Sequence, residues 1–146
     1  MGSATVMLLC GTELPQNVKG AVADCGYTSV RDEFAYHLHK MHVPRFPVIE
    51  TVDLWTKCFA GYRFVDVRPI DAVRRAKLPM LFIHGEADDF VPTEMVYDLY
   101  EACGSEKYLL TVPGAGHSES YQKNSALYED AFGAFLERCF AKETVS

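Results

Sequence analysis

Two residues that can do acid–base chemistry stand in this sequence where two buried strands are expected to end. Asp88 lies in an acidic turn after the apolar run Met80–Ile83, and His117 follows the run Tyr108–Val112 after a glycine-rich turn. Carboxyl ends of parallel strands meet at one edge of a sheet, so we expect the two side chains on neighbouring loops. An imidazole oriented by a carboxylate can take the proton of a serine hydroxyl, which is otherwise a poor nucleophile.

The pattern of apolar residues predicts the elements that position this pair. Met80–Ile83, a helix over Thr93–Cys103 and Tyr108–Val112 form one strand–helix–strand unit, which implies parallel strands and a right-handed crossover. A further short strand is predicted over Val18–Ala23. The fold class is therefore α/β, with a short, mostly parallel sheet of about three strands and flanking helices. The other predicted helices cover Met1–Thr12, residues 28–42 with Thr28 or Ser29 as the cap, Val48–Cys58, Asp71–Ala76 and Ser125–Phe140. The first of them is apolar throughout and is expected to be fully buried.

Length and composition narrow the class of protein. The 146 residues suit a single domain over 1–146, and the net charge of −6 argues against a nucleic-acid partner. The N-terminal apolar stretch is too short to cross a bilayer, so no membrane partner is expected. Five cysteines without a Cys-x-x-Cys pair indicate buried, reduced thiols and a cytoplasmic location. No metal and no cofactor are expected.

The residues around the acid–base pair carry a specific resemblance. The phrase Lys77-Leu78-Pro79-Met80-Leu81-Phe82-Ile83-His84-Gly85-x-x-Asp88-x-x-Val91-Pro92, followed by Val112-Pro113-Gly114-Ala115-Gly116-His117, resembles the C-terminal half of an α/β-hydrolase. It is most similar to the bacterial serine-hydrolase branch grouped with S33-type aminopeptidases and esterases, as is the segment Asp24–Phe34. The resemblance covers essentially the whole chain. It implies that Asp88 is the acid and His117 the base of a catalytic triad.

The nucleophile of that family is missing from the sequence. The family serine sits in Gly-x-Ser-x-Gly, and no such motif occurs here. The opening Met1-Gly2-Ser3 resembles the family sequence from one residue after the serine, so the resemblance assigns an oxyanion-hole backbone N–H to Met1. We therefore expect part of a serine hydrolase that acts on a small ester or peptide-like substrate, inactive alone. Ser3 is a poor substitute nucleophile because it lies inside the predicted helix. The alternative function is a non-catalytic assembly or binding module built on half a hydrolase.

Other candidate site residues have simpler interpretations. Asp24 is an alternative triad acid, because some α/β-hydrolases take the carboxylate from the earlier strand. His84 is expected to pack in the core and Asp89 to face solvent. His37, His39 and His42 do not share one helical face, which disfavours a metal site.

The segment 29–76 lies where this fold commonly inserts a lid, so we expect a helical cap there. Its aromatic residues are interpreted as core and cap packing, with an apolar substrate pocket as the alternative; they are Phe34, Tyr36, Phe46, Trp55, Phe59 and Tyr62. The strand Val18–Ala23 is expected to leave a bare sheet edge. We therefore expect a homodimer or higher oligomer, formed through that edge or through the helix Met1–Leu9.

Overall fold

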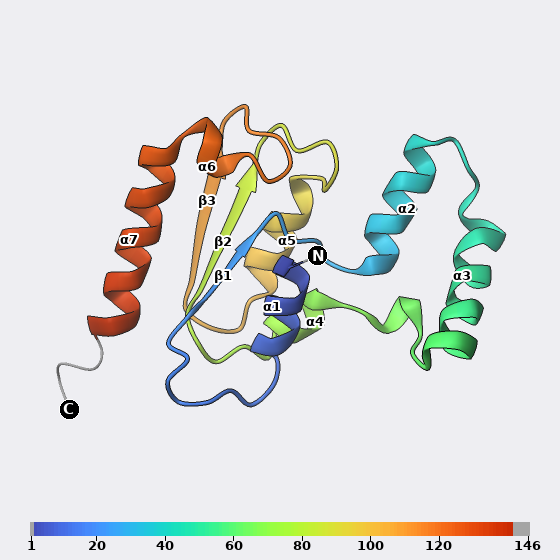
Figure 1. Ribbon diagram of the computed structural model, residues 1–146, viewed down its shortest axis with the longest axis horizontal. Coiled ribbons are helices and arrows are strands. Elements are labelled where there is room, and N and C mark those ends of the chain that lie inside the picture. Colours follow the sequence, from blue (N-terminus) through green and yellow to red (C-terminus); the bar gives the residue numbers. More distant parts are fainter. Residues whose placement is uncertain (1, 142–146) are drawn as a thin grey trace.

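The computed structural model describes residues 2–141 and has the predicted α/β fold (Figure 1). Its three strands are β1 (Ala21–Asp24), β2 (Met80–Gly85) and β3 (Lys107–Val112). They lie in the order β1-β2-β3, and both neighbouring pairs are parallel. The carboxyl ends of all three strands therefore lie at the same edge of the sheet, where the loops that follow them meet.

Helices cover both faces of the sheet. One face packs against α1 (Gly2–Cys10), α4 (Pro69–Val73) and α5 (Glu94–Ala102), and the other packs against α7 (Ser125–Ala141), which the short α6 (Ser120–Lys123) precedes. A separate helical segment lies to the side of this sandwich in Figure 1. It consists of α2 (Val30–Lys40), α3 (Arg45–Ala60) and the 3₁₀ turn η1 (Phe64–Asp66).

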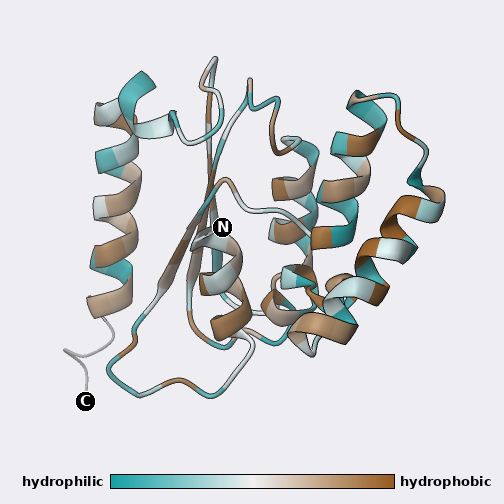
Figure 2. Cartoon of the chain, turned by 45° about the vertical axis from the view of Figure 1, so that its right-hand side comes forward, coloured by the Kyte–Doolittle hydropathy of each residue, from teal (hydrophilic) through white to brown (hydrophobic). Residues whose placement is uncertain are grey.

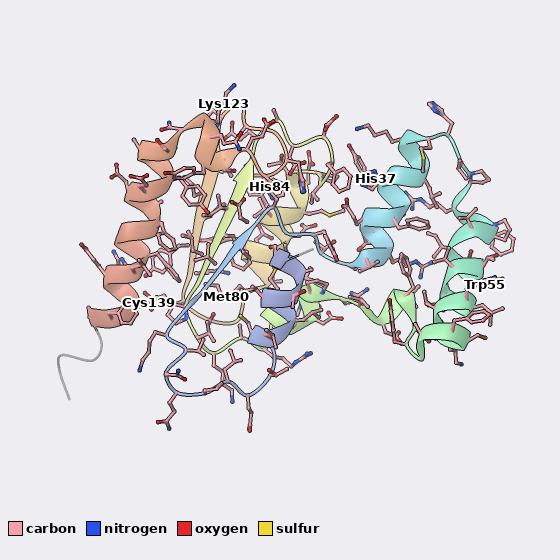
Figure 3. The ribbon with its side chains drawn as sticks, in the orientation of Figure 1. His37, Trp55, Met80, His84, Lys123 and Cys139 are labelled. Carbon is pink, nitrogen blue, oxygen red and sulfur yellow. The ribbon has the colours of Figure 1, made fainter. Side chains whose placement is uncertain are left out.

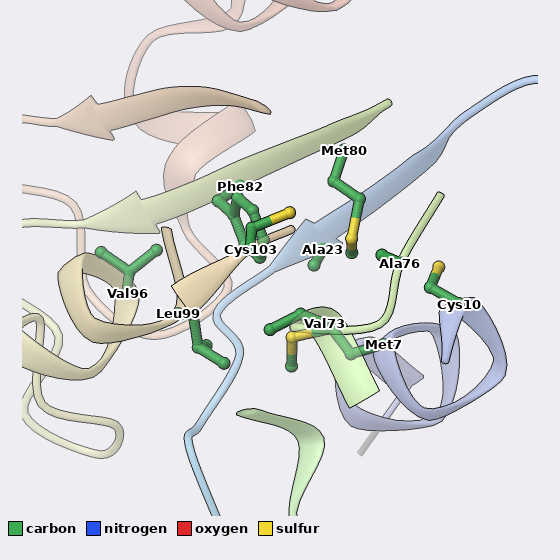
Figure 4. Close-up of a cluster of buried hydrophobic side chains, with 10 residues drawn as sticks. All are labelled: Met7, Cys10, Ala23, Val73, Ala76, Met80, Phe82, Val96, Leu99 and Cys103. Carbon is green, nitrogen blue, oxygen red and sulfur yellow. The ribbon is translucent and has the colours of Figure 1, made fainter. Parts of the chain in front are cut away.

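Alternation along β2 explains the two cores. Met80 and Phe82 face the cluster that contains Met7 of α1 and Leu99 of α5, drawn in Figure 4. Leu81 and Ile83 face the other cluster, against Phe135 and Cys139 of α7. Successive side chains of a strand point to opposite faces, so a central strand covered on both faces is apolar over most of its length, here from Met80 to Ile83. All six residues of β2 are buried.

The structure corrects several predicted boundaries. Strand β1 starts at Ala21 rather than at Val18, whose N–H donates to the Pro15 carbonyl in a turn. Strand β2 extends two residues past Ile83 to Gly85, pairing as far as Val112. The first helix is not fully buried as expected, because only one stripe faces the core: Ala4, Met7 and Cys10 are buried, and Leu9 is 51% exposed. An apolar helix without periodicity gave no signal of which side faces solvent.

The aromatic residues of the predicted cap do not form one cluster. Phe34 packs edge to face on Phe64, with their ring centroids 5.3 Å apart. Trp55 stacks on Phe59 at 4.8 Å on the outer side of α3, and both rings are largely exposed (Figure 3). The hydropathy colouring shows apolar residues along much of α3 (Figure 2). Packing therefore accounts for only part of the aromatic set.

Gly85, the last residue of β2, lies very close to the backbone of the loop that follows β3. A Cβ atom there would lie 2.3 Å from the carbonyl oxygen of Ala115 and 2.7 Å from that of Gly116. We therefore expect Gly85→Ala to lower the free energy of unfolding by about 2–4 kcal/mol in urea titrations, because backbone must move. Gly133→Ala is the control. It has open space in helix α7 and should raise stability by about 0.5–1 kcal/mol. Equal effects of the two substitutions would contradict this account.

Candidate active site

Asp88 sits in the turn that follows β2, and the turn is built around its carboxylate. Oδ1 accepts hydrogen bonds from the backbone N–H groups of Phe90 at 2.9 Å and Val91 at 2.8 Å. The N–H of Ala87 donates to the carbonyl of Ala115 at 2.9 Å, which ties this turn to the loop after β3. The side chain of Asp88 is fully buried.

His117 lies on the loop that leaves β3, and its ring reaches Asp88. Nδ1 of His117 is 2.8 Å from Oδ2 of Asp88, and the ring also lies 4.9 Å from that of Phe90. Gly114 at φ +67° allows the loop to turn back towards the sheet edge. The N–H of Gly116 donates to the Glu119 carboxylate at 3.1 Å, which fixes the residue before the histidine. The side chain of His117 remains 34% exposed.

The charges of this pair favour one tautomer. Burial raises the pKa of Asp88, but hydrogen bonds from Val91, His117 and Phe90 outweigh that effect, and the pKa is lowered overall. An ionised carboxylate only accepts, so Nδ1 of His117 carries the donated proton. The other ring nitrogen, Nε2, then has a free lone pair and can act as a general base.

His84 packs behind the pair, as predicted. Its ring is completely buried, near the carboxyl end of β2 (Figure 3). Nε2 lies 3.0 Å from the Val91 carbonyl, which can only accept, so Nε2 is the protonated nitrogen. The same nitrogen is 3.4 Å from Oδ2 of Asp88. His84 therefore supports the turn that holds the carboxylate and does not reach the cavity.

Cys25, which the sequence gave no reason to select, lies at the same site. It follows β1 directly, and its Sγ accepts a hydrogen bond from the N–H of Ser118 at 3.2 Å. Sγ of Cys25 lies within 4.8 Å of a carboxylate oxygen of Asp88 and of a ring nitrogen of His117. Burial raises the pKa of the Cys25 thiol to about 12, so the thiol is protonated and is not a nucleophile. The only available signal was its position immediately after a strand.

A cavity of about 340 Å³ opens beside His117. Most of its wall is apolar or aromatic and comes from the turn after β1, helix α2, η1 and the Asp88 turn. These residues are Tyr27, Val30, Phe34, Phe64, Phe90 and Val91. Its polar lining consists of Cys25, Glu33, His37 and His117. Another cavity of about 360 Å³, lined by Leu14, Pro15 and Lys77, contains neither member of the pair.

Glu33 and His37 form the polar side of the cavity wall on α2, which Ser29 caps. Nε2 of His37 is 2.9 Å from Oε1 of Glu33, whereas Oε2 is buried and receives no hydrogen bond from the described residues. Burial raises the pKa of Glu33, and the contact with His37 offsets only part of that rise. A buried carboxylate with an unused oxygen is suited to a ligand that donates hydrogen bonds.

Helix α2 is fastened to the Asp88 turn. The Tyr36 hydroxyl and the Lys40 ammonium both donate to the Asp89 carbonyl, at 3.2 and 2.9 Å. The ring of His37 also contacts that of Phe90, with centroids 4.5 Å apart. These contacts hold α2 over the cavity. Asp89 itself is 86% exposed, in line with the prediction, although it also pairs with Lys40.

The other candidate residues lie apart from the pair. Asp24 interacts with the Tyr128 hydroxyl and with Cys25, and no contact with His117 is found in the described part of the chain. The Ser3 hydroxyl is buried on α1 and makes no hydrogen bond with any described residue, His117 included. The predicted oxyanion-hole residue, Met1, lies outside the described residues.

Comparison with known sequences identifies relatives of the chain. The prolyl oligopeptidase family profile, a peptidase S9 family, matches residues 2–143. The uncharacterized protein YqkD of Bacillus subtilis is 30% identical over 138 residues, covering 94% of this chain and 45% of YqkD. The chain therefore spans about half the length of this curated relative.

Solved structures share the fold. An esterase of Pyrococcus furiosus superposes with a TM-score of 0.66 at 20% identity, over 94% of this chain and 50% of the esterase. The acylaminoacyl peptidase of Pyrococcus horikoshii gives 0.64 at 15% identity, over 94% of this chain and 22% of the peptidase. Both are α/β-hydrolases, so the three-stranded sheet is part of that fold. Across residues 2–141, we find no helix with the length and apolar character needed to span a bilayer.

The carboxylate of Asp88 should contribute stability that depends on pH. Because its pKa is lowered in the folded state, the charge stabilises the fold above the pH at which an unfolded aspartate titrates, about 3.9. This contribution is lost as the pH falls through the lowered folded-state pKa. We expect Asp88→Asn to cost about 1–3 kcal/mol at pH 7 in urea unfolding, and the difference from wild type to shrink below about pH 4. Asp98→Asn, on an exposed position of α5, is the matched control. A difference that grows towards low pH would contradict the assignment.

Proposed function

The chain belongs to the prolyl oligopeptidase family, and we propose that it supplies the acid and the base of a serine hydrolase that cleaves esters or peptide-like amides. The observation that carries the proposal is the 2.8 Å hydrogen bond between Nδ1 of His117 and the buried carboxylate of Asp88. That geometry leaves Nε2 of His117 free to take a proton. Hydrolysis by esterases and a peptidase among the structural neighbours supports the same reaction class.

In the proposed reaction a serine hydroxyl attacks the acyl carbon of the substrate. His117 takes the hydroxyl proton through Nε2 and gives it to the leaving group, which leaves an acylated serine. Water then attacks the acyl carbon, Nε2 takes its proton and returns it to the serine oxygen, and the acid product is released. Asp88 holds the ring in the reactive tautomer and stabilises its charged form. Its buried carboxylate suits this role because the two amide donors keep it ionised.

We propose that the nucleophilic serine comes from a segment outside these 146 residues. The family motif Gly-x-Ser-x-Gly is absent from the 146 residues, and the serine nearest the expected position, Ser3, has no hydrogen bond to His117. The 146-residue chain by itself should therefore be inactive. By resemblance, Met1 would follow that serine in sequence and its backbone N–H would be an oxyanion-hole donor.

The cavity supports a substrate with an apolar group beside the acyl carbon. Segment 29–76 would act as a cap that limits the size of that group, since α2 supplies Phe34 to the cavity wall and is fastened to the Asp88 turn. The unpaired Oε2 of Glu33 favours substrates that also carry a hydrogen-bond donor, such as the amino group of a peptide-like amide. A simple esterase would leave that oxygen unused.

We also propose a cytoplasmic location and self-association. All five cysteines are free thiols, which suits a reducing compartment. Strand β1 stands at the end of the β1-β2-β3 order, and Leu9 of α1 is 51% exposed nearby in the sequence. An uncovered strand edge pairs readily with another chain.

The hydrolase proposal predicts activity only when the serine is present. A longer protein that continues the reading frame upstream of Met1 should react with a fluorophosphonate at a serine in Gly-x-Ser-x-Gly. His117→Ala and Asp88→Asn in that protein should lower kcat for a p-nitrophenyl ester by roughly 10³–10⁴-fold. Lys123→Ala, on an exposed position of α6, is a control that should leave kcat unchanged.

The printed chain should neither label nor turn over the ester above buffer. Stoichiometric labelling of any of its own serines would overturn the proposal that the nucleophilic serine lies outside these 146 residues. A closed reading frame before the Met1 codon, or a longer protein that does not label, would instead favour the non-catalytic assembly or binding module.

Self-association predicts a concentration-dependent mass. Sedimentation equilibrium of the printed chain at high micromolar concentration should give a dimer or larger species. Val22→Pro, which removes an N–H donor in edge strand β1, should weaken that association if the edge is used. Leu9→Glu on α1 tests the alternative surface. A monomer at all concentrations would rule out both.

A further inference from the structure

We propose that Cys25, Asp88 and His117 form a binding site for Zn²⁺, and that the bound ion disables the acid–base pair. The binding itself is independent of catalysis, whereas its inhibitory effect rests on the proposed hydrolase function. The ligand atoms of the three side chains already lie within 4.8 Å of one another. Thiolate, imidazole and carboxylate are the donors that Zn²⁺ prefers in proteins.

The parallel sheet brings the three ligands together. Cys25 follows the last residue of β1, Asp88 follows β2 by three residues, and His117 follows β3 by five. In the order β1-β2-β3 these positions share one edge of the sheet. Bond lengths of about 2.0–2.3 Å place the ligand atoms of a tetrahedral zinc ion roughly 3.3–3.8 Å apart. Shifts well under 1 Å would therefore convert the 2.8 Å contact of Asp88 with His117 into a pair of ligands.

The backbone around the thiol is held in an unusual conformation. Cys25 has φ +53° and Ser118 has φ +60°, in the left-handed region that residues other than glycine rarely adopt. The N–H of Ser118 donates to Sγ of Cys25 at 3.2 Å, so the two unusual residues meet at this atom. A thiol that only filled space in a core would not need this arrangement, which fixes Sγ beside the catalytic pair.

An ion can reach the site, and the local charge favours it. Cys25 and His117 both line the 340 Å³ cavity, which leaves room for water or another ligand at a fourth position. Asp24 lies within 3.3 Å of Sγ and Asp88 contributes the ligand carboxylate. Glu33 is close enough to Asp88 for their charges to interact. The negative charges of Asp24, Glu33 and Asp88 around this site attract a divalent cation.

The binding step balances with the release of one proton. The Cys25 thiol gives its proton to solvent and its sulfur binds the ion, since a coordinating thiol is deprotonated. The proton on Nδ1 of His117 is replaced by the ion and is restored through solvent at Nε2, so the ring stays neutral. Asp88 exchanges a hydrogen bond for a metal bond. The resulting ring carries a proton at the nitrogen that must act as the base, so it cannot accept one from serine.

Cobalt titration of the printed chain tests the site directly, because Co²⁺ bound to a thiolate gives a near-ultraviolet charge-transfer band. We expect one Co²⁺ per chain with this band, and stoichiometric loss of the band when Zn²⁺ is added. Cys25→Ser should remove the band and weaken Zn²⁺ binding in calorimetry by at least about 10-fold. Cys58→Ser is the matched control, since Cys58 is an exposed thiol on α3.

NMR of the wild-type chain keeps the proposal falsifiable if Cys25→Ser does not fold. Zn²⁺ should shift the Cβ signal of Cys25 and the ring signals of His117, whereas the ring of His42 should not move. A folded chain without the cobalt band, or a Cys25→Ser variant that binds Zn²⁺ as wild type does, would overturn the site.

In the longer protein, Zn²⁺ should inhibit ester turnover reversibly, and the Cys25→Ser variant should resist this inhibition. If the cobalt band forms but the longer protein does not hydrolyse the ester, the result counts against the hydrolase proposal and leaves the metal site standing.

Discussion

The buried carboxylate of Asp88 is the interaction on which the site depends. One oxygen accepts from two consecutive amides of its own turn, and the other accepts from His117. A buried charge is costly unless hydrogen bonds compensate it, so the turn can keep its shape only while these donors stay in place. Folding of the turn and orientation of the imidazole are therefore one event. His84, 3.4 Å from the same carboxylate, fills the space behind it.

The parallel sheet explains why this carboxylate has such neighbours. Each strand ends at the same edge, so each following loop brings there one side chain with a heteroatom that could bind an ion or a proton: Cys25, Asp88 and His117. The close approach of Gly85 to Ala115 fixes the spacing of two of these loops. A side chain at Gly85 would push them apart, and the 2.8 Å contact with His117 would be lost with it. Core packing and site geometry thus share a single backbone constraint.

Sequence reasoning reached the parallel pairing of β2 with β3 because Met80–Ile83 and Tyr108–Val112 are largely apolar runs that flank a periodic helix. It also selected Asp88 and His117, since both are polar residues placed just beyond strand ends, and the structure brings them into contact. It missed Cys25 because a cysteine at a strand end looks like any buried thiol. The proximity of Cys25 to Asp88 and His117 depends on which strands are neighbours in the sheet, and that is a property of tertiary structure. The exposed Trp55 and Phe59 were misinterpreted for a similar reason, since aromatic content does not reveal which helix face is covered.

Glu33 is the residue of the cavity wall whose burial works against stability at neutral pH. Burial raises its pKa, so the folded state holds a proton more tightly than the unfolded chain. Stability is then lost as the pH rises through the titration of this group, and the ionised form at neutral pH costs free energy. A glutamine or an apolar residue would avoid that cost. The Glu33 carboxylate has one oxygen unpaired by the described residues, and it shares the cavity wall with His117, so a donor group or cation that entered the cavity would supply the missing partner.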